Sequence, residues 1–218
     1  MIVVLLGAPG AGKGTLASAL KDQLKVHHIS TGDLIRAEIK AGSQIGLEIK
    51  KCVESGALVS DEIVTRMIKG KIDSSVSDKR GYMFDGFPRT NAQAADLDKI
   101  LGANGLAVDF ALLMEASTDV VLTRLTGRRV CKACGALYHL TNMPSKVSGI
   151  CDACGGELYQ RADDNKETIL NRMTVYAEST KPIIDHYKSQ SKLRVINADK
   201  GAEAVRQEML KILDEKKS

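Results

Sequence analysis

The stretch Gly7-Ala8-Pro9-Gly10-Ala11-Gly12-Lys13-Gly14-Thr15 decides the fold class of this chain. Gly7 and Gly12 have the spacing of a phosphate-binding loop (P-loop), and Lys13 follows directly. In such a loop, backbone N–H groups surround phosphate oxygens, while the next helix N-terminus and the lysine add positive potential. Gly14 occupies the place where a Ser or Thr is usual, and Thr15 comes one place later. The loop therefore predicts a nucleotide phosphate site without specifying the reaction.

Strands and helices are predicted to alternate on both sides of this loop. The apolar run Ile2–Leu6 precedes it, and apolar residues at helical spacing follow over 15–24. Gly42 and Gly46 are predicted to separate short helices. Further strands are predicted at 27–29, 82–85, 110–114 and 193–197, and further helices at 33–40, from about 60, 91–101, from about 118, 166–187 and 202–213. This alternation predicts an α/β, three-layer P-loop fold with a central parallel sheet and an active site at the carboxyl ends of the strands.

Length and composition limit the classes of protein. The chain has 218 residues, and about 150 residues per domain suggest one substantial domain with a smaller insert. Its formal charge of +4 is too small to indicate a polyanion partner. Aromatic residues make up only 4% of the chain, so few side chains could stack on the bases of single-stranded nucleic acid. No apolar run approaches the roughly 20 residues of a membrane helix, and the segment 1–6 lacks the features of a signal peptide. We therefore expect a cytoplasmic protein without a nucleic-acid or membrane partner.

Four of the five cysteines form two C-x-x-C pairs, Cys131 with Cys134 and Cys151 with Cys154, and 16 residues separate the pairs. This spacing is typical of a zinc ribbon, in which four thiolates make a closed and therefore structural site. The segment 127–164 is rich in glycine and poor in apolar residues, so a metal would replace a core there. Two disulfides or four free thiols remain alternatives, and His139 is a further potential ligand.

Two other protein classes share a P-loop or a zinc ribbon. A GTPase would carry an N-K-x-D motif, but Asn165-Lys166-Glu167-Thr168 lacks the final Asp. A nucleic-acid-binding module with an ATPase core would use the basic residues around the cysteines, such as Arg129, Lys132 and Lys146. Few aromatic residues lie between them, which makes this class a weaker alternative.

Four further segments carry a family resemblance. They are Ser30-Thr31-Gly32-Asp33-Leu34-Ile35-Arg36, Asp85-Gly86-Phe87-Pro88-Arg89-Thr90, Arg124-Leu125-Thr126-Gly127-Arg128-Arg129 and Arg161-Ala162-Asp163-Asp164. With the P-loop, and in this order, they resemble the adenylate kinase family from Met1 to about Leu213. The resemblance implies reversible, Mg²⁺-dependent phosphoryl transfer from ATP to AMP, giving two ADP. It also implies a monomer.

The resemblance further implies a division into three parts. Residues 1–29, 60–126 and 165–218 would form the core P-loop domain. Residues 30–59 would form a helical AMP-binding segment. Residues 127–164 would form a small, β-rich lid that holds the zinc site and closes over the substrates.

The residue types around these motifs suit phosphoryl transfer to a phosphate. The acceptor oxygen is already anionic near neutral pH, so no general base is required, and catalysis depends on positioning and charge neutralisation. Guanidinium groups suit that task because they bind phosphate bidentately and stay charged. By resemblance, Asp85 acts on Mg²⁺ through water. The catalytic residues implied by the resemblance are Lys13, Asp85, Arg89, Arg124, Arg128, Arg161 and Arg172.

The resemblance also assigns the nucleotide sites. The implied ATP-binding residues are Gly10, Ala11, Gly12, Lys13, Gly14, Thr15, Arg128, Leu137, Tyr138 and Lys200. The implied AMP-binding residues are Thr31, Arg36, Ala57, Leu58, Val59, Gly86, Phe87, Pro88, Arg89, Gln93, Arg161 and Arg172. Gln93 would hydrogen-bond the adenine of AMP, and Thr31 stands where related pyrimidine monophosphate kinases usually carry Ala. A GTP donor, or UMP or CMP as acceptor, remains the nearest alternative.

Overall fold

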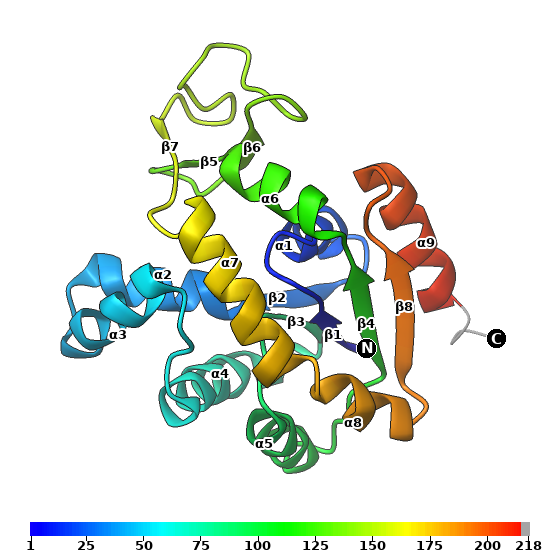
Figure 1. Ribbon diagram of the computed structural model, residues 1–218. Helices are drawn as coiled ribbons and strands as arrows, with labels where there is room; N and C mark the ends of the chain where they lie inside the picture. Colours follow the sequence, from blue (N-terminus) through cyan, green and yellow to red (C-terminus); the bar gives the residue numbers. More distant parts are fainter. Residues whose placement is uncertain (215–218) are drawn as a thin grey trace.

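A central parallel sheet organises the computed structural model, which describes residues 1–214 (Figure 1). Its strand order is β2-β3-β1-β4-β8. The strands are β1 (Ile2–Leu6), β2 (Val26–Ser30), β3 (Gly81–Asp85), β4 (Phe110–Glu115) and β8 (Leu193–Asn197). Asp85 is in register with Leu5 on one side and with Ser30 on the other. The carboxyl ends of three strands therefore meet at one edge, as the predicted α/β fold requires.

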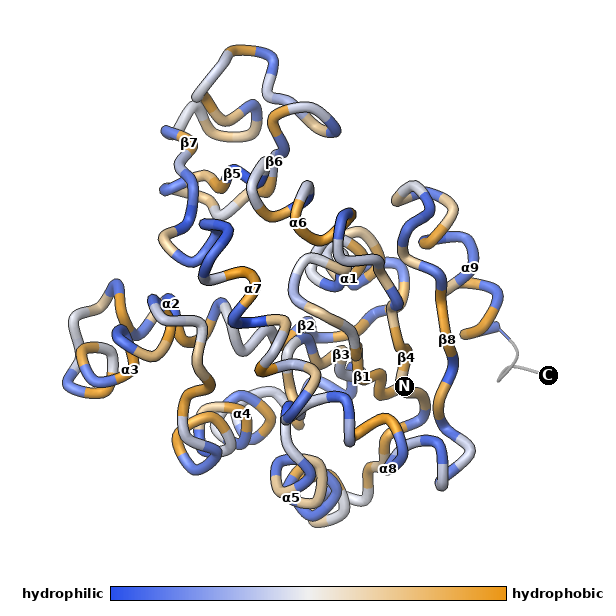
Figure 2. Tube along the Cα trace, in the orientation of Figure 1, coloured by the Kyte–Doolittle hydropathy of each residue, from blue (hydrophilic) through white to orange (hydrophobic). Residues whose placement is uncertain are grey.

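The two faces of the sheet are covered by different helices, which makes three layers. Alternate residues of β1 point to opposite faces. Val3 and Leu5 pack with α1 (Lys13–Leu20) and α9 (Ala202–Asp214). Val4 and Leu6 pack on the other face, whose helices are α4 (Asp61–Ser75), α5 (Asn91–Gly102) and α8 (Ile183–Ser189). Figure 2 shows the hydrophobic residues of β4 and β8 within these layers. None of the helices in residues 1–214 is long and apolar enough to cross a membrane.

Two helices, α2 (Thr31–Ala41) and α3 (Gln44–Ser55), extend from the sheet beside β2 (Figure 1). Gly42 ends α2 with φ 66°, a conformation that favours glycine. The prediction that Gly46 also separates helices is wrong, because it lies inside α3. A Cβ there would collide with the carbonyl group of Glu38 on α2. Gly46 thus permits close packing of the two helices and does not end one.

Side-chain caps explain where several helices begin. Ser30 caps α2 by accepting a hydrogen bond from the backbone N–H of Asp33. Thr90 caps α5 by accepting from the N–H of Gln93 at 3.2 Å. Asn165 caps α7 (Lys166–Val175) by accepting from the N–H of Thr168 at 2.9 Å. The caps begin helices directly after the loops that line the carboxyl edge of the sheet.

The long helix predicted at 166–187 is interrupted within its length. The interruption is a single π-helical stretch, η2 (Tyr176–Thr180), between α7 and α8. Thr180 is buried there and donates a hydrogen bond to the carbonyl oxygen of Arg89 at 3.1 Å. A short 3₁₀ helix, η1 (Val76–Asp78), follows α4. π-Helical turns such as η2 are frequent at functional sites, and η2 lies beside the cleft described below.

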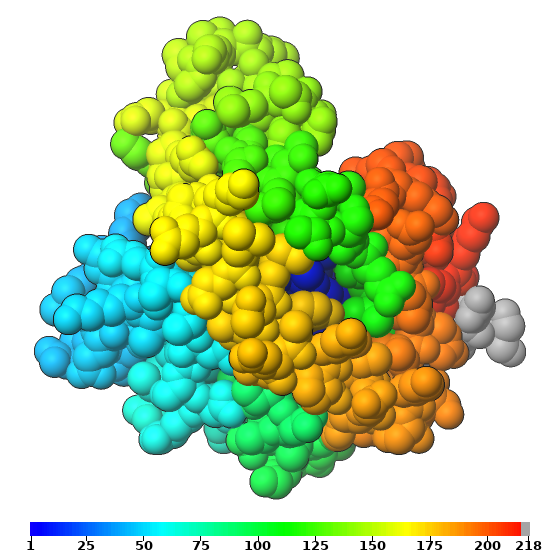
Figure 3. Space-filling model, in the orientation of Figure 1, coloured from blue at the N-terminus to red at the C-terminus, as the bar shows by residue number. Residues whose placement is uncertain are grey.

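A small antiparallel sheet projects from the rest of the molecule beyond α6 (Thr118–Thr126) (Figures 1 and 3). Its strand order is β6-β5-β7. The strands are β5 (Arg128–Cys131), β6 (Leu137–His139) and β7 (Leu158–Tyr159). Several large apolar side chains between β6 and β7 are exposed, namely Leu140, Met143, Val147 and Ile150. This unit therefore has little hydrophobic core of its own.

Candidate active site

A cleft of about 1030 Å³ lies at the carboxyl edge of the large sheet. The loop after β1 forms its floor, and residues of α2, α7 and the small sheet form its walls. The predicted residues that line it are Gly10, Ala11, Gly12, Lys13, Gly14, Thr15, Arg36, Ala57, Leu58, Val59, Asp85, Gly86, Pro88, Arg89, Arg124, Arg128, Leu137, Tyr138, Arg161, Arg172 and Lys200. Residues far apart in the sequence thus meet in one cavity, where parallel α/β folds commonly bind ligands.

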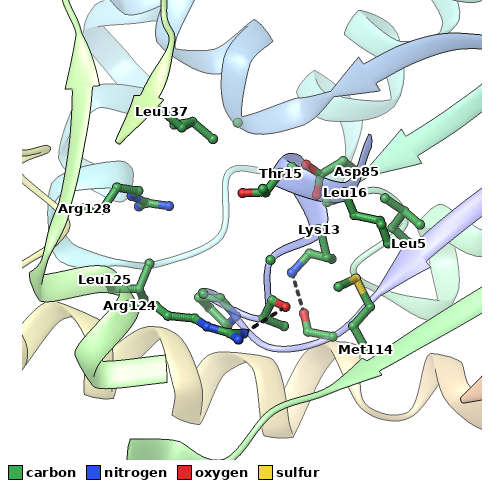
Figure 4. A pocket seen from close by; sticks show the side chains of 18 of the residues that line it. Leu5, Lys13, Thr15, Leu16, Asp85, Met114, Arg124, Leu125, Arg128 and Leu137 are labelled. Carbon is green, nitrogen blue, oxygen red and sulfur yellow. Dashed lines mark hydrogen bonds between the residues drawn. The ribbon is translucent and has the colours of Figure 1, made fainter. Parts of the chain in front are cut away.

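The floor of the cleft depends on glycines with positive φ. Gly7 has φ 138° and Gly12 has φ 99°, and a Cβ on Gly7 would collide with the carbonyl group of Met114. Lys13 folds back over this loop, and its Nζ donates to the carbonyl oxygens of Gly7 at 2.7 Å and Ala8 at 2.9 Å (Figure 4). Burial lowers the pKa of Lys13 to about 8, and the charge of Asp85 opposes this shift. The floor thus presents a desolvated amine beside backbone N–H groups.

Asp85 ends β3 next to the P-loop helix. Its Oδ2 lies 3.6 Å from Nε2 of His28, and it would lie 3.2 Å from a Cβ on Gly14. A side chain at position 14 would therefore crowd the Asp85 carboxylate. Burial opposes ionisation of Asp85, but the nearby His28 imidazole and the charge of Lys13 outweigh it and keep the pKa below its usual value. A carboxylate and the nearby Thr15 hydroxyl are oxygen donors of the kind that Mg²⁺ prefers (Figure 4).

Two arginines line the side of the cleft nearer α2. Arg89 donates from Nε to the carbonyl oxygen of Gly86 at 2.9 Å, and its own N–H donates to Gln93 at 2.7 Å. Burial and the neighbouring charge of Arg172 lower the pKa of Arg89, which remains cationic at neutral pH. Arg36 pairs with Asp33 at 2.6 Å. These contacts aim both guanidinium groups before any ligand is bound.

The other arginines approach from α6, the small sheet and α7. Arg128 forms a two-point pair with Asp164, at 2.8 Å from Nε and 2.5 Å from Nη2, and the Asp164 side chain is 0% exposed. Arg172 pairs with Asp163 at 2.9 Å. Figure 4 shows Arg128 and Leu137 pointing toward Thr15, with Arg124 beside the loop. Asp164 and Asp163 therefore hold Arg128 and Arg172 in orientations that suit an anion in the cleft.

Arg36, Arg128 and Arg172 each pair with a carboxylate. Arg161 has no carboxylate within ion-pair distance among residues 1–214, and its buried Nε has no hydrogen-bond partner there. Burial, followed by the charges of Arg128 and Arg36, lowers the pKa of Arg161 to about 10. A buried donor without a partner is costly. An anion bound in the cleft would satisfy it.

The four cysteines of the small sheet converge on one point. Their Sγ atoms all lie within 4.8 Å of one another, with Cys131 and Cys154 at 3.5 Å and Cys134 and Cys151 at 3.6 Å. These separations are too long for disulfides and agree with the roughly 3.8 Å expected between sulfurs of a tetrahedral zinc site with Zn–S bonds of about 2.3 Å. The donor set therefore fits a metal ion, and the disulfide alternative does not describe this structure.

Tyr138 supplies a further contact to this cluster. Its hydroxyl lies 3.4 Å from Cys151 Sγ, and this hydrogen bond, against some desolvation, lowers the pKa of Cys151 to about 6. His139, the other candidate ligand, is used elsewhere. Its Nε2 lies 3.1 Å from the carbonyl oxygen of Thr123, and its Nδ1 accepts from the N–H of Thr141 at 3.1 Å.

Comparison with known proteins agrees with this geometry. Residues 5–192 match the family described as adenylate kinase. The adenylate kinase of Desulforamulus reducens is 46% identical over 210 residues, which cover 96% of this chain and 98% of that protein. The adenylate kinase of Syntrophobacter fumaroxidans is 47% identical over 205 residues, which cover 94% of this chain and 96% of that protein. The adenylate kinase of Thermosipho melanesiensis is 44% identical over 213 residues, which cover 98% of this chain and 99% of that protein.

The chain belongs to the adenylate kinase family. It is therefore a nucleotide phosphotransferase that converts ATP and AMP reversibly into two ADP, and Mg-nucleotides are the substrates of this family. The resemblance stated from the motifs is confirmed. The individual residue roles are a separate matter, because the comparisons concern whole chains.

Three residues that an adenylate kinase of this pattern would use for AMP lie behind the cleft wall. Phe87 is fully buried in the core. Thr31 donates to the carbonyl oxygen of Gly86 at 2.8 Å. Gln93 accepts from the N–H of Arg89 and donates to Asp61 at 2.8 Å, so both ends of its amide are engaged. In this structure these residues support Arg89 and the turn before it, and direct contact of Gln93 with the base stays a prediction.

The sequence reasoning gave no role to the carboxylates that orient the adenylate kinase arginines. Asp163 and Asp164 were quoted as part of a motif, but their ion pairs with Arg172 and Arg128 come from folding 127–164 back onto α7. Their position directly after Arg161 was the available signal. His28 was also missed, because only the register of β2 with β3 brings it to Asp85.

Proposed function

We propose that ATP binds on the P-loop beneath the small sheet and that AMP binds on the side formed by α2, α3 and Arg89. The observation that supports this assignment best is the convergence of cationic side chains on one cleft. Those side chains are Lys13, Arg36, Arg89, Arg124, Arg128, Arg161 and Arg172. Two nucleotides that carry four phosphates between them need such a site, since their like charges must be brought together.

The reaction then needs neutralisation and alignment more than proton transfer. The attacking AMP oxygen is already anionic, so no general base is required. Arg89 and Arg36 hold the acceptor phosphate, while Lys13, Arg124, Arg128, Arg161 and Arg172 surround the transferring group. Their guanidinium forks match phosphate oxygens bidentately. Arg128 and Arg172 would exchange part of their contact with Asp164 and Asp163 for phosphate as the nucleotides bind.

Asp85 and Thr15 are the residues we assign to the magnesium ion of Mg·ATP. When bound, the ion neutralises charge on the donor phosphates. The ionised state of Asp85, maintained by His28 and Lys13, suits contact with the ion through water. The bare position at Gly14 leaves the Asp85 carboxylate beside the start of α1.

The division of the chain supports this arrangement. We propose a core of residues 1–29, 60–126 and 165–218, an AMP-binding segment at 30–59, and a lid at 127–164. Zinc at Cys131, Cys134, Cys151 and Cys154 would be structural, since four thiolates leave no open position. We further propose a cytoplasmic monomer whose partners are ATP, AMP and ADP.

Phosphoryl transfer from Mg·ATP to a panel of nucleoside monophosphates tests the residue roles. We expect preference for AMP, and Arg89→Ala should lower kcat/KM for AMP by roughly 10³ because it removes a buried bidentate phosphate contact. Arg66→Ala is the matched control, since Arg66 is exposed and its one ion pair among residues 1–214 is with Glu62 on the same helix, α4. Preference for UMP or CMP would overturn the assigned base recognition. An active Arg89→Ala enzyme would overturn the assigned acceptor site.

A further inference from the structure

We propose that Tyr138 is a positioning residue that couples metal occupancy at the four cysteines to ATP binding in the cleft. The inference rests on the proposed zinc site of the lid and adds a function for the strand that links this site to the nucleotide. It predicts that metal and ATP influence each other's binding, although the metal touches no substrate.

The first observation is the hydrogen bonding of the Tyr138 hydroxyl. It lies 3.4 Å from Cys151 Sγ and accepts a hydrogen bond from the N–H of Asp152 at 2.8 Å. Because the Asp152 N–H occupies a lone pair of the hydroxyl, its proton remains available to donate to the sulfur. Tyr138 thus fastens β6 to the second cysteine pair at two adjacent points.

The second observation is which side of the lid sheet each residue occupies. Directly paired residues of antiparallel strands share a face, and neighbours along a strand alternate. Val130 pairs with Leu137, Arg129 with Tyr138, and Arg128 with His139. Arg128 and Leu137 therefore share a face, and Figure 4 shows both side chains directed toward the P-loop. Tyr138 borders the cleft as well, but its side chain turns to the opposite face of the sheet, where its hydroxyl lies 3.4 Å from Cys151 Sγ.

The third observation is how β6 is attached. β6 spans only Leu137–His139 and forms a short ladder with β5, and the His139 side chain lies 3.1 Å from the carbonyl oxygen of Thr123 on α6. Among residues 1–214, Tyr138 is the only β6 side chain hydrogen-bonded to the second cysteine pair or Asp152. Loss of the metal would free Cys151 and the loop around it. The anchor of Tyr138 would then move, and with it Leu137 on the face toward ATP.

The expected magnitudes follow from groups that hydrogen-bond metal ligands in other proteins. Removal of such a partner typically costs about 10- to 100-fold in metal affinity. A coupling free energy acts equally in both directions, so a nucleotide that gains affinity from the metal must also raise the affinity of the cysteines for the metal, which we expect to measure as slower metal release. The proposal therefore has a readout that does not depend on catalysis.

Tyr138→Phe tests the proposal because it keeps the ring and removes the hydroxyl. Zinc release from the loaded enzyme into a chromogenic chelator is measured with and without a non-hydrolysable ATP analogue and excess Mg²⁺. We expect release from the variant to be at least about tenfold faster. The analogue should slow release from the unmodified enzyme but not from the variant. KM for ATP should rise several-fold while KM for AMP stays unchanged.

Tyr159→Phe is the matched control. Tyr159 is the other tyrosine of the lid sheet, on β7, and its hydroxyl forms no hydrogen bond within residues 1–214. It should release zinc at the unmodified rate and keep both KM values. A control that behaves like Tyr138→Phe would overturn the specific role of Tyr138.

The remaining outcomes distinguish the Tyr138 contact, the coupling between metal and ATP, and the metal site itself. Unchanged zinc release in Tyr138→Phe would overturn the contact with the metal site. Faster release with unchanged KM for ATP, and with the analogue still protective, would overturn the coupling. A fully active enzyme that binds no zinc after loading would overturn the metal site and this proposal together, while leaving the phosphotransfer roles intact.

Discussion

The core and the lid of this chain are stabilised by different means. In the core, β1 and its neighbours bury continuous apolar runs between two layers of helices, and Val3, Val4 and Leu5 are almost completely enclosed. In the lid, the three strands are short, several apolar side chains are exposed, and the four cysteines converge on one point. A segment of this size cannot enclose a core, so the proposed metal–thiolate bonds would replace apolar burial.

The same contrast applies to the groups that would contact phosphate. On the P-loop of the core, Lys13 is held by the backbone carbonyl oxygens of Gly7 and Ala8. Arg128, the first residue of the lid sheet, is held by the carboxylate of Asp164. A backbone-held group is available without movement. A carboxylate-held group is oriented by a partner that the substrate must partly displace, which suits a part of the molecule that closes over its ligands.

The largest expected effect comes from the core. Lys13→Met should lower kcat by about 10³ or more, because a preorganised charge at the transferring group is lost. Its melting temperature should stay within a few degrees, since the amine contributes two backbone contacts and is destabilised by burial. Steady-state kinetics and thermal melting measure both. Lys21→Met, at the exposed end of α1, is the control, and a residual activity above a tenth would contradict the assigned role of Lys13.

Asp164→Asn tests the carboxylate-held arginines. It removes the buried anion that binds Arg128 at two points, so we expect kcat/KM for ATP to fall by roughly 10- to 100-fold and the melting temperature to drop. Glu157→Gln is the matched control, because its pair with Lys132 is exposed and such pairs contribute about 0–1 kcal/mol. Equal kcat/KM for ATP and equal melting temperatures in the two variants would contradict a role of Asp164 in orienting Arg128.

The pH dependence of ATP binding tests the desolvated amine. Burial lowers the pKa of Lys13 to about 8, so the free enzyme loses this charge as pH rises above that value. We expect kcat/KM for ATP to fall by up to about tenfold per pH unit above 8, since kcat/KM reports the free enzyme. With saturating ATP, the phosphate charges restore the proton and kcat should change less. A kcat/KM profile that stays flat to about pH 10 would contradict this expectation.

Metal removal should have the smallest effect on the chemical step. Chelation should lower the melting temperature by several degrees because the lid has little apolar core, while kcat changes only a few-fold. Metal content and melting curves are measured on the same samples. Cys52→Ser, on α3 outside the cluster, should retain both the metal and the melting temperature. An unchanged curve after verified metal removal would contradict the structural role of the metal.

Much of the fold followed from local patterns. The apolar runs predicted the strands of the large sheet, and the cysteine spacing predicted the cluster. The error at Gly46 has a physical cause. Glycine weakens an isolated helix, but here the approach of α2 requires a residue without a side chain. The π-helical turn at 176–180 was also unpredicted, because it is set by the contact of Thr180 with Arg89.

The sequence by itself determined the P-loop, the α/β class, the family and the set of arginines, because glycine conformation, strand hydrophobicity and motif order are properties of neighbouring residues. Only the tertiary structure decided how those arginines are held. The pairs of Arg128 with Asp164 and of Asp85 with His28 join residues that are distant in the chain. The contact between Tyr138 and Cys151 likewise depends on which face of a short strand each residue occupies. Such contacts depend on packing between elements, and local sequence patterns do not encode them.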